Sequence, residues 1–66
     1  MVTYELRWEA EDGADGIEVY RDEDEALEDM EEFIQEDKSV TYASLTAVET
    51  FGGVLWDMRI VREFTR

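Results

Sequence analysis

Apolar and polar residues alternate at the start of the chain. Every second residue from Val2 to Trp8 is apolar, and the residues between them are polar or charged. This period of two predicts a strand with one buried face. Residues 10–16 are acidic and contain two glycines, which is typical of a turn. The apolar Ile17 and Val19 then predict a short second strand, so the first third of the chain reads as a hairpin.

The apolar period changes to that of a helix at Asp22. Asp22 is an N-cap residue type, and Glu25 follows three positions later as in a capping box. The helix should end near Asp37 or Lys38. At 100° per residue its apolar side chains fall within an arc of about 120°, which predicts one buried face; they are Ala26, Leu27, Met30, Phe33 and Ile34.

A second hairpin is predicted around Gly52-Gly53, because two consecutive glycines between apolar runs favour a two-residue turn. Phe51 should then lie across from Val54, with a bulge or loop near residues 40–42, which fit this register poorly. The register pairs small with large residues on one face, as a half-buried hairpin requires: Ala43 with Arg62, Leu45 with Ile60, and Ala47 with Met58.

The predicted order is ββαββ in a single domain over residues 1–66, an α+β fold with a four-stranded antiparallel sheet and one acidic helix packed on one face. A domain of this size buries only about 60% of the surface of its unfolded chain, so the core is thin. The residues expected in or beside it are Tyr4, Leu6, Trp8, Ile17, Val19, Leu27, Met30, Phe33, Ile34, Leu45, Trp56, Met58 and Ile60.

Composition removes several classes of function. The chain has no cysteine and no histidine, which excludes disulfides and the usual zinc sites. An apolar content of 44% is that of a folded protein and not of an acidic disordered tail. No apolar run approaches the roughly 20 residues that span a bilayer. We therefore expect a cytoplasmic protein that needs no cofactor.

The negative charge is concentrated in one part of the chain. Fifteen of the nineteen carboxylates lie between Glu9 and Asp37, where Arg21 is the only base. This stretch therefore has a net charge of −14, and the rest of the chain brings the total to −13. Such a block attracts cationic surfaces and repels nucleic acids and anionic membranes. The expected partner is therefore a basic protein surface.

The helical carboxylates are expected to form two rows. Ten carboxylates in residues 22–37 occupy about 24 Å of helix, or one charge per about 2.4 Å, against 1.7 Å in duplex DNA. Like charges four residues apart cost about 0.2–0.5 kcal/mol each, and no base inside the helix offsets them. A domain with so small a core that retains this repulsion is expected to use the charge for a function. One row holds Glu25, Asp29, Glu32 and Glu36, and the other holds Asp24, Glu28 and Glu31.

Acidic residues can also serve in catalysis, in metal binding or in adaptation to high salt. A catalytic carboxylate pair needs a cleft that raises one pKa, for which this core leaves little room, so we expect no enzyme. The segment Glu11–Gly16 has calcium-type oxygen ligands but lacks the ligand spacing of an EF-hand, and no metal is expected. A small acidic structural or regulatory domain of a halophile is the main alternative: the single Lys against five Arg fits it, whereas the nearly neutral residues 38–66 do not. An acidic adaptor that binds a basic protein unrelated to nucleic acid remains an alternative.

The acidic segment Asp22–Asp37, the hairpin Val2–Tyr20 and the aromatic-rich hairpin Tyr42–Phe64 together resemble the small phage-encoded anti-CRISPR proteins that mimic DNA. The likeness is one of architecture and charge over the whole chain, and in format it is closest to the inhibitors of type I-C systems. A monomer is favoured over a dimer, and the expected location is the cytoplasm of a bacterial host. The resemblance implies binding to a CRISPR effector complex at the surface that target DNA would occupy.

The hypothesis from sequence is a non-enzymatic inhibitor that blocks a basic nucleic-acid-binding surface. Its contact residues would come from the two helical rows and from the first turn. The predicted partner-binding residues are Asp24, Glu25, Glu28, Asp29, Glu31, Glu32 and Glu36 on the helix, with Glu11, Asp12 and Asp15 in the turn.

Overall fold

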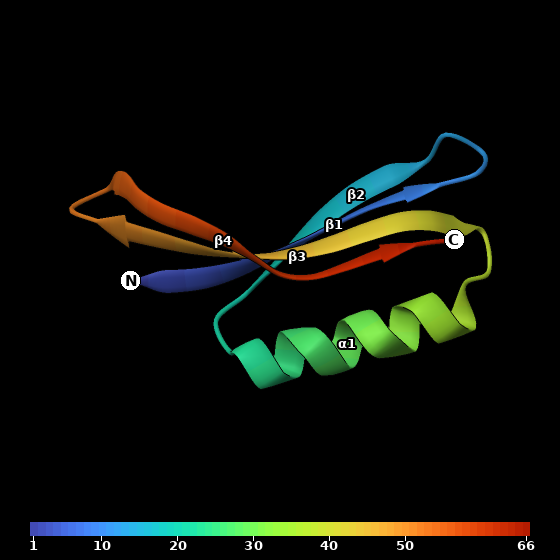
Figure 1. The fold of residues 1–66 in the computed structure, drawn as a ribbon, viewed down its shortest axis with the longest axis horizontal. Helices are drawn as coiled ribbons and strands as arrows, with labels where there is room; N and C mark the ends of the chain where they lie inside the picture. Colours follow the sequence, from blue (N-terminus) through green and yellow to red (C-terminus); the bar gives the residue numbers. More distant parts are fainter.

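A computed structural model describes all 66 residues and shows one four-stranded antiparallel sheet with a single helix on one face (Figure 1). This confirms the predicted ββαββ order and α+β class. The sheet order is β2-β1-β3-β4, so β1 and β3 are central and β2 and β4 are edges. The elements are β1 (Val2–Ala10), β2 (Asp15–Tyr20), α1 (Glu23–Glu36), β3 (Val40–Phe51) and β4 (Val54–Thr65).

The hairpin of β3 and β4 turns where two glycines predicted it. Gly52 and Gly53 have φ values of 60° and 81°, the left-handed conformations that a two-residue turn between twisted strands needs. Phe51 and Val54 face each other across the turn. This hairpin extends well beyond the N-terminal end of α1 (Figure 1), so its tip has no helix above it.

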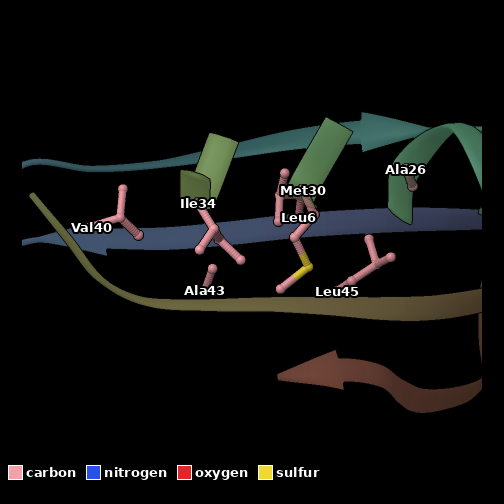
Figure 2. Close-up of a cluster of buried hydrophobic side chains, with 7 residues drawn as sticks. All are labelled: Leu6, Ala26, Met30, Ile34, Val40, Ala43 and Leu45. Carbon is pink, nitrogen blue, oxygen red and sulfur yellow. The ribbon is translucent and has the colours of Figure 1, made fainter. Parts of the chain in front are cut away.

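The core lies between α1 and the two central strands. Met30 is fully buried and reaches between Leu6 and Leu45, and Ile34 points toward Ala43 (Figure 2). The small side chain of Ala43 leaves room for the larger residues of the helix. Seven buried residues form this cluster: Leu6, Ala26, Met30, Ile34, Val40, Ala43 and Leu45. Four more expected core residues, Tyr4, Trp8, Leu27 and Phe33, are half-buried and pack against it.

The prediction that Met58 and Ile60 belong to the core is wrong. Two irregularities in the β3–β4 pairing, at Trp56 and Val61, each insert one extra residue into β4. Met58 therefore pairs with Val48 and Ile60 pairs with Thr46, on the face of the sheet that α1 does not cover. A register counted outward from a turn cannot foresee such insertions, because a bulge exchanges the faces of all later residues.

Ile17, Val19 and Trp56 are also exposed, contrary to expectation. In β2 the helix side is taken by Glu18 and Tyr20, since these pair with Leu6 and Tyr4 of β1. Because β2 is an edge strand, the polar ends of the Glu18 and Tyr20 side chains still reach water. The irregularity expected near residues 40–42 is confirmed, because the β1–β3 register shifts where Tyr42 and Val40 pair with β1.

Both ends of α1 are capped by side chains. Asp22 is the N-cap, as predicted, and its Oδ2 accepts a hydrogen bond of 2.9 Å from the backbone N–H of Glu25. The helix ends at Glu36 with Asp37 as C-cap, where Arg66 donates to the carbonyls of Ile34 and Lys38. That guanidinium offsets the acidic residues at the negative end of the helix dipole. The helix is too short and too polar to cross a membrane.

Gly16 is required where β2 passes under Trp8. A Cβ at Gly16 would lie 2.5 Å from the Trp8 indole carbon Cζ2, and the indole also packs edge-on against Phe33 of α1 with ring centroids 5.2 Å apart. We expect Gly16→Ala to lower the free energy of unfolding by about 1–3 kcal/mol, because ring and strand must move apart. Urea unfolding followed by tryptophan fluorescence measures this. An unchanged midpoint would show that Trp8 can move freely.

Candidate functional site: the acidic face of α1

The acidic face of α1 is the only dense array of one charge on the molecule. Eight carboxylates lie on the 14 residues of the helix, which is about 21 Å long, so one charge occurs per about 2.6 Å. All of the helical residues predicted for the site are exposed except the half-buried Asp29. The two predicted rows run along opposite flanks of the helix. We refer to them as the β2-side row (Glu25, Asp29, Glu32, Glu36) and the β4-side row (Asp24, Glu28, Glu31).

The β2-side row borders a shallow groove between α1 and β2. Asp29, Glu32 and Glu36 line one wall, Glu18 and Tyr20 line the other, and the floor is apolar. No base lies within 4.0 Å of any carboxylate of this row. The groove therefore presents uncompensated carboxylates that can accept hydrogen bonds from Arg or Lys side chains of another protein.

Tyr20 connects this groove to the core. Its phenol donates a 3.0 Å hydrogen bond to Glu18 Oε2. Partial burial, and then the neighbouring carboxylates of Glu18 and Asp29, raise the pKa of Tyr20 well above its usual value. The phenol therefore stays neutral at any physiological pH and acts as a fixed donor between acids that repel each other.

The β4-side row is partly neutralised by arginines of β4. Arg62 forms an ion pair with Glu31, and Arg59 approaches Glu23 at 3.5 Å. The hydrogen bond from Arg62, more than any other cause, lowers the pKa of Glu31 below its usual value. Glu31 is thus already engaged within the molecule, and of the predicted contact residues it is the least free to bind a partner.

Removing Arg62 should restore the ordinary titration of Glu31. A lowered pKa means that the pair stabilises the fold above the unfolded-state pKa and that this contribution disappears as pH falls through the folded-state value. We expect Arg62→Gln to raise the pKa of Glu31 toward its usual value, measured by NMR titration of the side-chain carboxyl carbon. Arg7→Gln, which removes the exposed Arg7–Glu5 pair, is the control and should leave Glu31 unchanged. An unchanged Glu31 titration in Arg62→Gln would contradict the pairing.

The acids of the first turn are divided between two locations. The backbone N–H of Glu11 donates a 2.8 Å hydrogen bond to the carbonyl of Ser39, so Glu11 and the adjoining Asp12 lie beside the C-terminal end of α1. Asp12 Oδ1 also accepts from the N–H of Ala14 at 3.0 Å and shapes the turn. Asp15 instead pairs across the strands with Glu9, on the face away from α1. The structure therefore places Glu11 beside the connection between α1 and β3, and it does not bring Asp12 or Asp15 together with the helical rows.

Glu18 is a member of this surface that the sequence analysis missed. Because Ile17 and Val19 are apolar, alternation placed them on the core side and Glu18 on the opposite side. Gly16 is the signal that could have located Glu18. A glycine is needed opposite Trp8 because a side chain there would collide with the indole, so Gly16 lies on the helix side of β2. Side chains alternate along a strand, and the next residue on that side is therefore Glu18.

The carboxylates are arranged as rows and do not converge. No group of three or more acidic side chains is placed to hold a metal ion. Rows of exposed carboxylates are suited to ion pairing with an extended basic surface. No protein-family model, curated protein or solved structure matches this chain, so the argument for its function rests on the fold and on the chemistry of this surface.

Proposed function

We propose that this protein is a non-enzymatic inhibitor that occupies a basic nucleic-acid-binding surface of another protein, with α1 in place of the polynucleotide. The observation that carries the proposal is the β2-side row with Glu18. These are five carboxylates on two adjoining elements with no base within 4.0 Å. Their charge is therefore available to a partner and not consumed inside the fold.

The spacing of the acids supports mimicry of a polyanion. Successive carboxylates of a row lie about 4.5–6 Å apart along the helix axis, and the helix as a whole carries about two-thirds of the linear charge density of duplex DNA. The Lys and Arg side chains that bind phosphates in a basic channel also form ion pairs with carboxylates. Charge would then govern the rate of association, and shape would govern the lifetime of the complex.

The acids are retained although they cost stability. Within α1, Glu28 and Glu32 and then Glu32 and Glu36 are like charges four residues apart, each pair costing about 0.2–0.5 kcal/mol. Glu9 and Asp15 add a like-charge pair across β1 and β2. In a domain with only ten buried residues, this arrangement is explained by recognition of a cationic partner.

A CRISPR effector complex is the partner class that we propose, following the resemblance to DNA-mimicking anti-CRISPR proteins. In such complexes a positively charged channel holds the nucleic acid through its backbone. Binding there would exclude target DNA and prevent interference without any chemical reaction. It would also place the protein in the bacterial cytoplasm.

A competition experiment tests this function. A purified type I-C effector complex is mixed with labelled target duplex, and the protein is titrated in at several salt concentrations. We expect displacement of the duplex, with an affinity that falls steeply as salt rises. Binding to the complex without displacement would show an adaptor and not a mimic. Absence of binding, together with unfolding at low salt, would show a halophile's domain.

A further inference from the structure

Strand β4 exposes five large apolar side chains, Val54, Leu55, Trp56, Met58 and Ile60, which the acidic face does not explain. Every residue from Val54 to Ile60 is exposed. Trp56 is 72%, Met58 is 55% and Ile60 is 62% exposed. β4 is also an edge of the sheet, so its outer backbone groups have no strand to pair with. A long apolar edge of this kind is a template for pairing with another strand.

The sequence of β4 is complementary to itself about Met58. When two copies of this strand run antiparallel with Met58 opposite Met58, Asp57 of each copy faces Arg59 of the other. Trp56, which precedes Asp57, then lies near Ile60 of the other copy. Apolar residues meet apolar residues, and each charge meets its opposite, which is the pattern that stabilises cross-strand pairs. A two-fold interface requires this self-complementarity.

Salt screening limits the opposition of the protein's negative charge to this pairing. Asp57 and Arg59 cancel within the paired segment. Because α1 lies over the central strands, two helices related by a two-fold axis beside β4 would be about four strand spacings apart, or roughly 20 Å. This is more than two Debye lengths at physiological salt, so their repulsion is largely screened. Arg59 remains able to pair, since its contact to Glu23 is 3.5 Å long and exposed.

We propose that two copies of this chain associate through β4, antiparallel about Met58, to form a two-fold dimer with a continuous eight-stranded sheet. This replaces the monomer expected from the sequence, and it is independent of the proposed function because the acidic face stays outside the interface. Bulges at Trp56 and Val61 confine regular pairing about Met58 to residues 57–59. The apolar side chains on either side of that segment therefore supply most of the buried area.

A charge exchange tests both the dimer and its register. Sedimentation equilibrium of the wild-type protein should show a monomer–dimer equilibrium. Asp57→Arg and Arg59→Asp each place two like-charge pairs at the interface, and each should weaken dimerisation by about tenfold. An equimolar mixture of the two variants restores both opposite-charge pairs, so heterodimers should form with affinity near that of the wild type. The double variant Asp57→Arg/Arg59→Asp should recover in the same way.

Controls separate this interface from others. Val19→Lys adds a charge to an exposed position on the opposite edge and should leave dimerisation unchanged, whereas Met58→Lys should abolish it. Far-UV circular dichroism checks that each variant is folded. A protein that is monomeric at millimolar concentration would overturn the proposal. So would a dimer that Val19→Lys disrupts and that does not respond to the charge exchange.

Discussion

Reversing Glu28, Glu32 and Glu36 to lysine is expected to abolish inhibition while the domain stays folded. The three side chains are exposed and lie on both flanks of α1. The variant changes the net charge from −13 to −7 and places cations where the partner presents its own. At about 1 kcal/mol or more for each reversal, the combined loss of affinity is on the order of 100-fold. Competition with labelled duplex for the effector complex measures it.

The matched control reverses three exposed acids that are not on the helix. Glu9→Lys, Glu49→Lys and Glu63→Lys together give the same net charge of −7, but they leave both helical rows intact. We expect this variant to keep most of its affinity. Equal losses in the two variants would mean that total charge, and not its arrangement on α1, decides binding. Full inhibition by the helix variant would rule out the proposed function.

Met30→Ala is expected to unfold a large fraction of the protein. Met30 has no exposed surface and lies at the centre of the only core cluster. Truncating such a side chain costs about 2–5 kcal/mol, from lost burial and from the cavity left behind. A domain of this length has a total stability of only about 3–10 kcal/mol. Urea denaturation followed by far-UV circular dichroism gives the change in the free energy of unfolding.

Ile17→Ala provides the comparison, since it also shortens an aliphatic side chain but at a position on β2 that is 49% exposed. The loss there should stay below about 1 kcal/mol. Similar losses for the two variants would mean that α1 does not depend on Met30 for its attachment to the sheet. The acidic face would then lack the rigid support that recognition requires.

Local features of the sequence were sufficient to predict the elements. Asp22 caps α1 and Gly52-Gly53 form the turn because each is determined by a few neighbouring residues. The faces of the edge strands were not predictable in the same way. The bulge at Trp56 and the steric demand of Trp8 on Gly16 involve residues that meet only in the folded sheet. Alternation alone therefore assigned Met58 and Ile17 to the wrong face.

The candidate site was likewise predictable from the sequence only where neighbouring residues determine it. The two helical rows follow from the period of the helix, and all of their residues are exposed except the half-buried Asp29. Which row stays unpaired depends on the sheet order. Because β4 lies on one flank of α1 and β2 on the other, Arg62 reaches Glu31 of the β4-side row, and Arg59 reaches Glu23, which belongs to neither row. Glu18 joins the opposite row for the same reason.

The placement of Arg59 and Arg62 makes the electric field of the molecule one-sided. The negative potential is stronger on the β2 side of α1 than on the β4 side, where the two arginines partly cancel it. A basic surface is therefore attracted more strongly to the β2 side of α1 than to the β4 side. In the proposed dimer the two β2 edges point in opposite directions, so one assembly could engage two basic surfaces at once and dissociate from them more slowly than a single copy.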